Sequence, residues 1–174
     1  MEWRNESISK RTKTIKIFAI LTITILAGCI ENVEKKENTT TYQNEEFLTW
    51  FQISIETLQL YLNHTSDALT FQNWQEAKFW AEELMNFTDE QMTTCMSFHL
   101  TEPYSSLRNK YYQALNHCYL GAYYTKKTII DLENYDYDSL EKDCDKAVNY
   151  FHQTKNDIDH CILIIYTIGG DYHV

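Results

Sequence analysis

From Phe47 onward, apolar residues recur at alternating steps of three and four positions, a spacing that is typical of long amphipathic helices. The first stripe consists of Phe47, Phe51, Ile55, Leu58, Leu62, Thr65 and Leu69. Three similar stripes span residues 74–98, 104–132 and 137–165. Each stripe lies along one helix face, so the pattern predicts four helices that each bury one side.

The breaks between these stripes are short and fall at 70–73, 101–103 and 134–138. The chain has only four Gly and one Pro, whereas a sheet with many turns needs more of both. Short connections between long helices make neighbouring helices antiparallel. We therefore predict an all-α fold, an up-down antiparallel four-helix bundle over residues 45–170.

Local signals mark where these helices begin and end. Thr101 is a candidate N-cap for the third helix, and Pro103 lies near its start. Asp138 can cap the fourth helix, and Gly169 with Gly170 would end it.

A second arrangement stays open at this point. The stretches around 74–84 and 114–124 resemble tetratricopeptide repeats in their alternation of large and small residues. The resemblance implies two stacked helical hairpins. The repeat consensus itself is not met, so the bundle is favoured.

The N-terminus has the organisation of a secretory signal. Residues 1–16 carry five Lys and Arg against two Glu, and an apolar run follows at 17–27. A basic segment, a short apolar segment and small residues before a cleavage point define a signal peptide. We assign residues 1–28 to it, because the apolar run is shorter than the roughly 20 residues of a transmembrane helix.

The end of this segment, Leu26-Ala27-Gly28-Cys29, resembles the lipobox of prokaryotic lipoproteins at all four positions. The resemblance implies that the Cys29 thiol receives a diacylglyceryl group and becomes the first mature residue. Two acyl chains give stable anchoring. The expected location is therefore the extracytoplasmic face of the cell membrane, with polar residues 29–44 as a flexible tether.

The charge of the mature chain limits its partners. From Cys29 onward there are 10 Lys and Arg against 23 Asp and Glu, a net charge of −13. Nucleic acid binding is disfavoured because it needs cations to neutralise phosphates. An anionic lipid surface would also repel this domain, so membrane contact is expected through the Cys29 anchor.

Neither a nucleophile motif nor a phosphate loop is present, so no catalytic residue and no cofactor is predicted. Helix lengths place His117 and His152 at a similar height to Glu56 and Glu83. Their positions beside the stripes, and the lack of a paired Glu-x-x-His pattern, argue against a metal site.

A column of Tyr112, Tyr119 and Tyr123 lies beside the third stripe at steps of seven and four. Core packing accounts for such a column, but aromatic residues are also enriched at protein interfaces. We therefore expect a non-enzymatic protein-interaction or structural module that contacts an unknown protein partner through these residues. The alternative is a small-ligand-binding module with an aromatic-lined pocket. The composition also resembles that of small archaeal lipoproteins, which implies no activity.

Three Asn-x-Ser/Thr triplets follow the signal peptide, at Asn38, Asn63 and Asn86. Such triplets are glycosylation acceptors in an exported chain of a suitable organism. Asn38 falls in the tether, and the other two fall between stripe positions, where they are expected to face outward.

Four cysteines other than Cys29 occupy stripe positions, namely Cys95, Cys118, Cys144 and Cys161. This placement predicts buried thiols that pack as small apolar groups. Export also permits disulfides. Antiparallel counting places Cys118 and Cys144 too far apart to bond, and Cys95 and Cys161 could bond only if their helices touch.

The variant Cys29→Ser is expected to be released from the membrane or to stay uncleaved, because a serine hydroxyl does not replace the thiol as lipid acceptor. Membrane fractionation and the electrophoretic mobility of the product measure both outcomes. Thr40→Ser in the tether is the control. Normal processing and membrane retention of Cys29→Ser would contradict the anchor prediction.

Overall fold

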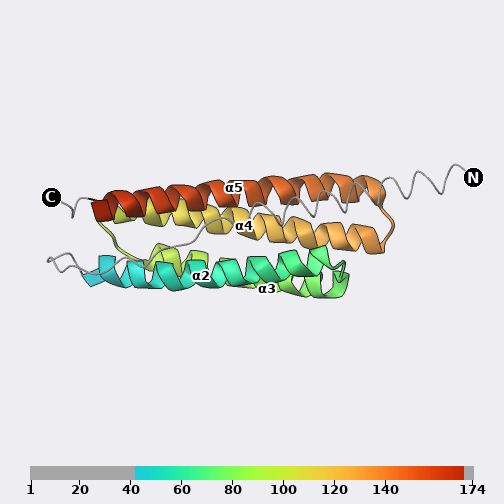
Figure 1. The fold of residues 1–174 in the computed structure, drawn as a ribbon, viewed down its shortest axis with the longest axis horizontal. Coiled ribbons are helices and arrows are strands. Elements are labelled where there is room, and N and C mark those ends of the chain that lie inside the picture. The colour runs from blue at the N-terminus through green and yellow to red at the C-terminus, as the bar shows by residue number, and fades with distance from the viewer. Residues whose placement is uncertain (1–41, 171–174) are drawn as a thin grey trace, which may run out of the picture.

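The computed structural model describes residues 42–170, which form helices α2 (Tyr42–Thr70), α3 (Trp74–Ser97), α4 (Tyr104–Glu133) and α5 (Tyr137–Gly170). The helices run up and down along the long axis of the molecule (Figure 1). The predicted all-α, up-down four-helix bundle is confirmed. The signal peptide, Cys29 and Asn38 lie outside the described residues.

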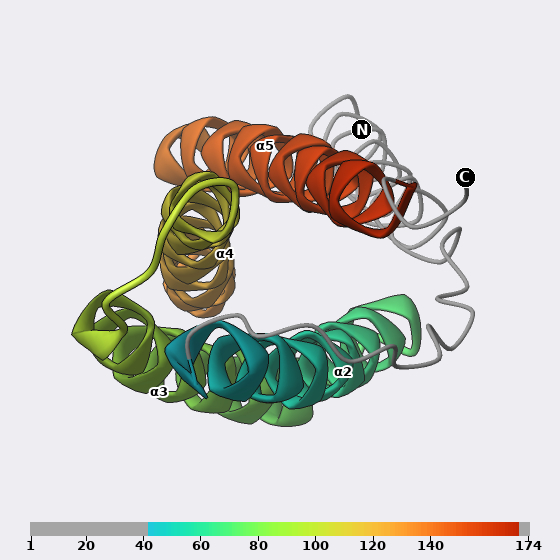
Figure 2. The same ribbon diagram turned by 90° about the vertical axis from the view of Figure 1, so that its left-hand side faces the viewer.

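Each helix packs most extensively against its neighbour in sequence, and α4 and α5 form the most extensive pair. The end-on view shows α2 beside α3, α4 next to α3, and α5 next to α4 (Figure 2). This sequential packing is what short connections between antiparallel helices produce. Helix α2 begins at Tyr42, three residues before the start of the bundle at 45 that the sequence predicts.

The predicted stripes form the core. Their central residues are buried in all four helices, for example Leu58, Leu84, Cys118 and Ala147. Several stripe residues near the ends of α3, α4 and α5, such as Tyr104, are half-buried. The helical period thus determines which side chains enter the core. Some side chains near the helix ends remain partly exposed to solvent.

Tyr111 of α4 lies at the centre of this core and is fully buried. Its ring packs edge-on against Phe51 of α2, with a centroid separation of 4.6 Å. Its hydroxyl lies 2.8 Å from the Ser54 hydroxyl, also on α2. A buried phenol needs a polar partner. Ser54 supplies it, so this pair fixes α2 against α4 across the bundle.

Two predicted helix caps are wrong by a few residues. The third helix starts after Pro103 with no side-chain cap, while the Thr101 hydroxyl accepts a hydrogen bond from Asn44. In the fourth helix the cap is Asp136 rather than Asp138, because the Asp136 carboxylate accepts the Ser139 amide at 3.2 Å. Helix α5 extends to Gly170, which is the last residue that the structure describes.

Among helices α2 to α5, none combines the length and the apolar character needed to span a membrane.

Close packing at Gly121 of α4 gives a test of this core. A Cβ atom at Gly121 would lie 2.9 Å from two ring carbons of Phe151 on α5. We expect Gly121→Ala to lower the free energy of unfolding by about 1–3 kcal/mol, because overpacking a tight core outweighs the better helix propensity of Ala. Chemical denaturation measures the change.

The matched control is Phe151→Leu, alone and combined with Gly121→Ala. Removing the ring makes room for the new methyl group, so the alanine substitution is expected to cost less in the leucine background. Equal costs in both backgrounds would contradict the steric explanation.

Candidate functional site

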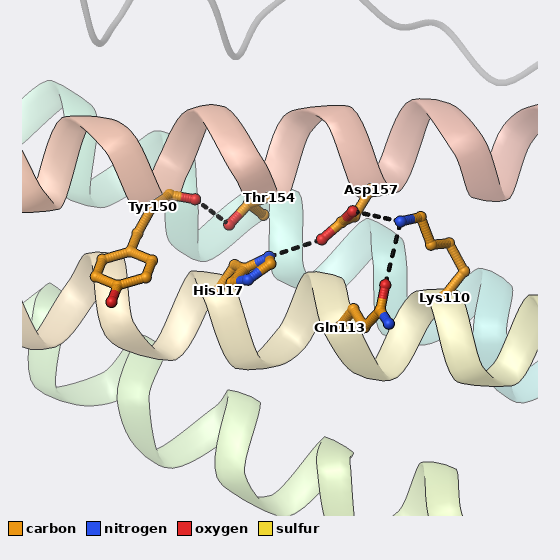
Figure 3. Close-up of polar contacts among 6 residues, drawn as sticks. All are labelled: Lys110, Gln113, His117, Tyr150, Thr154 and Asp157. Carbon is orange, nitrogen blue, oxygen red and sulfur yellow. Dashed lines mark hydrogen bonds and ion pairs between the residues drawn. The ribbon is translucent and has the colours of Figure 1, made fainter.

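Two nearly buried carboxylates of α5 face α4 on the outer side of the bundle. One of them, Asp157, accepts a hydrogen bond from Lys110 Nζ at 2.7 Å through one oxygen. Its other oxygen lies 2.7 Å from His117 Nδ1 (Figure 3). Lys110 also reaches the Gln113 side chain at 3.1 Å. Asp157 is therefore held from two sides by side chains of the neighbouring helix.

The second carboxylate, Asp143, is bound by two lysines. Lys127 Nζ lies 2.7 Å from one oxygen, and Lys146 Nζ lies 2.8 Å from the other. Burial raises the pKa of Asp143, but these hydrogen bonds outweigh it and hold the pKa below its ordinary value. The carboxylate is thus charged at neutral pH and joins the two helices.

Aromatic rings connect the two carboxylate sites. Lys146 lies over the Tyr124 ring at 4.5 Å, and Tyr124 stacks on Tyr150 with centroids 5.7 Å apart. Tyr150 in turn stacks on His117 at 6.1 Å. The result is a continuous polar and aromatic strip, which we call the α4/α5 seam. Its members are Lys110, His117, Tyr124, Lys127, Asp143, Lys146, Tyr150 and Asp157.

A cavity of about 430 Å³ lies beside the Lys110 end of the seam. It is lined by Ser106, Asn109, Lys110, Gln113, His160, Leu163 and Ile164. Five of these seven residues have polar or charged side chains, two are aliphatic, and none is Tyr, Trp or Phe. This differs from the aromatic-lined pocket expected for a ligand-binding module.

The Asp157–His117 pair has the geometry with which a carboxylate orients a general base. A hydrolytic reaction by covalent catalysis also needs a nucleophile next to that base. In the described part of the chain, the hydrogen bond of His117 goes to Asp157 and to no hydroxyl or thiol. The pair therefore joins helices in this structure.

The four residues considered for a metal site, His117, His152, Glu56 and Glu83, do not form a shared cluster among the described residues. His117 faces Asp157, and His152 and Glu56 are exposed. Over residues 42–170, no group of three or more His, Cys, Asp or Glu side chains is arranged to hold a metal ion.

Cys95, Cys118, Cys144 and Cys161 are buried and free, as their stripe positions predict. Among them, the Cys95 thiol lies 3.5 Å from the Arg108 carbonyl oxygen. Burial raises the pKa of Cys95, Cys144 and Cys161 to about 12 and raises that of Cys118 as well. All four are therefore protonated at neutral pH, and a protonated thiol is a poor nucleophile.

Two of the three predicted surface tyrosines are exposed: Tyr112 by 37 % and Tyr123 by 39 %. They flank the junction of α4 with α3, where Lys126 and Glu82 form an ion pair at 2.9 Å. The two helices are antiparallel, so equal numbers of residues counted from this ion pair in opposite sequence directions reach the same height. Tyr112 lies fourteen residues before Lys126, and Met96 lies fourteen residues after Glu82, so Tyr112 is level with the exposed Met96. Tyr119 is half-buried in the same column.

The two Asn-x-Thr triplets within the described residues both lie in the middle of helices. Asn86 is exposed, whereas Asn63 is half-buried. The threonine of each triplet is buried and bonds to the carbonyl four residues earlier, Thr65 to Tyr61 and Thr88 to Leu84. In the folded domain, the asparagine of each triplet is therefore at least partly accessible to solvent, whereas the threonine is not. Glycosylation of these residues stays a prediction.

No family model, curated protein sequence or solved structure matches this chain.

The seam was missed by sequence reasoning, although a signal for it is present. Six of its eight members recur every seven residues: Lys110, His117 and Tyr124 on α4, and Asp143, Tyr150 and Asp157 on α5. A seven-residue repeat keeps residues on one side of a helix along a packed pair. Because the repeat mixes charges with aromatic rings, a search for apolar periodicity does not detect it.

Comparison of two carboxylates on α5 tests the role of the seam. Asp157→Asn is expected to lower the free energy of unfolding by about 1–3 kcal/mol, because it removes a nearly buried charge from Lys110 and His117. Asp159→Asn is the control, since Asp159 is exposed and pairs with Lys155 four residues away. It should cost less than about 0.5 kcal/mol. Equal losses in thermal or chemical unfolding would contradict a special role for Asp157.

Proposed function

We propose that this chain is a lipid-anchored lipoprotein of the extracytoplasmic membrane face, and that its helical bundle binds another protein without catalysing a reaction. The anchor part of the proposal rests on the sequence at 26–29 and on the basic and apolar segments before it. Both acyl chains would be attached at Cys29, as in the lipoproteins that the motif resembles.

The interaction part of the proposal is carried by one observation, the exposure of Tyr112 and Tyr123 along the outer junction of α3 and α4, where Tyr112 lies level with the exposed Met96. A tyrosine ring offers a large apolar contact area with few rotatable bonds, and methionine adapts its shape to a partner. The core does not need these side chains, because Leu107, Tyr111 and Cys118 fill the inner face of the same helix.

A second candidate function, small-ligand binding, is supported by the cavity beside Lys110. Its lining favours a polar ligand with a short aliphatic part, since Lys110 and His160 can bind polar groups while Leu163 and Ile164 contact carbon. Because Lys110 is already paired with Asp157, protein binding is preferred.

Photocross-linking from the tyrosine column tests the proposed function. A benzophenone amino acid in place of Tyr112 or Tyr123, in the full-length protein in its native membrane, is expected to yield a cross-linked product with one defined protein. The same group in place of His152, which is exposed on α5, is the control and should give much less of that product. Equal products from all three positions, or adducts with lipid alone, would contradict the proposal.

A further inference from the structure

Large apolar side chains are also exposed along the outer junction of α2 with α3, on the opposite flank of α3 from the tyrosine column. Leu60 of α2 is 54 % exposed and Phe79 of α3 is 52 % exposed. Together with the residues around them they form a surface that we call the α2/α3 patch. It consists of Ile53, Leu60, Tyr61, His64, Phe79, Trp80 and Phe87.

Ring contacts make this patch continuous across the two helices. His64 of α2 stacks on Trp80 of α3, with centroids 4.3 Å apart and planes 12° apart. Tyr61 lies 5.2 Å from Phe87 and 6.0 Å from Trp80. Phe79 meets Trp80 edge-on at 5.1 Å. The aromatic surface thus extends from the junction of α2 and α3 to the exposed ring of Phe79.

The α2 side of the patch is an apolar stripe that the core does not use. Ile53, Thr57, Leu60 and His64 follow one another at steps of four, three and four, so they share one face of α2. The contact of His64 with Trp80 shows that this face borders α3. Ile53 and Leu60 are both exposed along it.

The α3 side alternates carboxylates with aromatic rings. Glu76, Trp80, Glu83, Phe87 and Glu90 follow one another at steps of four, three, four and three. They therefore lie along the single edge of α3 whose rings contact α2. Glu76 and Glu90 are exposed, and Glu83 is half-buried. None of these three forms an ion pair with another described residue.

The helices that carry the patch have almost no positive charge. Between residues 42 and 97 there are nine Asp and Glu and a single basic residue, Lys78. That lysine is engaged on the far flank of α3, where it pairs with Glu133 of α4 at 3.3 Å. By contrast, residues 104–170 carry nine Asp and Glu against seven Lys and Arg. The net negative charge of the described helices is therefore concentrated on α2 and α3, the two helices that carry the patch.

We infer that the α2/α3 patch binds a basic amphipathic segment of another protein. Apolar side chains of such a segment would cover Leu60 and Phe79, while its Lys and Arg side chains would meet Glu76, Glu83 and Glu90. An amphipathic helix that lays its apolar face into a groove between helices is a common mode of peptide recognition. Charge complementarity selects a basic segment over an acidic one.

Charge and composition disfavour the other occupants. A second copy of this chain would bring an equally acidic patch, and an anionic lipid surface would be repelled. The tether at 29–44 has too few apolar residues to cover the exposed rings. A basic partner fits both the apolar and the charged part of the surface.

This inference goes beyond the proposed function, because it names a second surface and the charge of its partner. The test uses the purified full-length protein in non-ionic detergent. The probe is a fluorescent peptide of about 18 residues, or five helical turns, with Leu at steps of three and four residues and Lys at the positions between them, so that it forms an amphipathic helix. The same peptide with Glu in place of Lys is the control probe. Fluorescence anisotropy measures binding.

We expect the Lys peptide to bind and the Glu peptide not to bind. Leu60→Ser combined with Phe79→Ser should weaken binding of the Lys peptide by about tenfold. The matched control, Tyr135→Ser combined with Tyr166→Ser, alters two side chains, one in the turn before α5 and one on α5, that are 71 % and 65 % exposed. It should change binding by less than about twofold.

The charge contribution is tested separately. Glu83→Lys should also weaken binding by about tenfold. Glu141→Lys, which changes the charge equally at an exposed position of α5, should have little effect. A tenfold rise in salt should weaken binding of the Lys peptide to the wild-type protein, because the attraction between exposed charges is screened.

Several outcomes would overturn the inference: no binding of the Lys peptide, equal binding of the Glu peptide, or equal effects of patch and control variants. Sedimentation that reveals a dimer lost only in the patch variants would assign the surface to a second copy instead. If the peptide fails while cross-linking through Tyr112 succeeds, the inference is wrong and the proposed function stands.

Discussion

The hydrogen bond between Tyr111 and Ser54 fixes the relation between the two halves of the bundle. Helix α2 packs mainly on α3, so its position relative to α4 depends on what crosses the core. Tyr111 crosses it with a ring against Phe51 and a hydroxyl 2.8 Å from that of Ser54. A buried hydroxyl without a partner would cost about 1–3 kcal/mol, so only one rotation of α2 satisfies both groups. The orientation of the outer face of α2 depends on this contact.

The two outer faces use carboxylates in opposite ways. In the α4/α5 seam, Asp143 and Asp157 are nearly buried, and each is bound by two basic or imidazole side chains. These carboxylates hold helices together. Along the α2/α3 patch, Glu90 is exposed and forms no ion pair with another described residue. Because the hydration of an exposed carboxylate is retained, such charges add little to the fold and are free to attract a partner.

Periodicity predicted the fold but only part of the site. The steps of three and four identified the core faces, because burial of one helix side is set by the helical repeat. They gave no information about polar partners such as Asp157 and His117, since these depend on the register between two helices and on side-chain reach. The turns were located but not their details. Gln72 and Tyr135 adopt positive φ values of 57° and 59° where no glycine marks the turn. Exposed Tyr112 and Tyr123 were found because their column lies beside the stripe.

The buried thiols have a consequence for the location outside the cytoplasm that we propose for this chain. Oxidants and alkylating reagents attack the thiolate. In Cys95, Cys118, Cys144 and Cys161 the thiol is both covered and protonated. Their reaction therefore has to wait for the bundle to open, and the rate of modification would follow the frequency of opening rather than the reagent's own reactivity. In an oxidising environment, oxidised cysteines would therefore accumulate slowly, in proportion to how often each molecule unfolds. Molecules that open more often would be modified sooner.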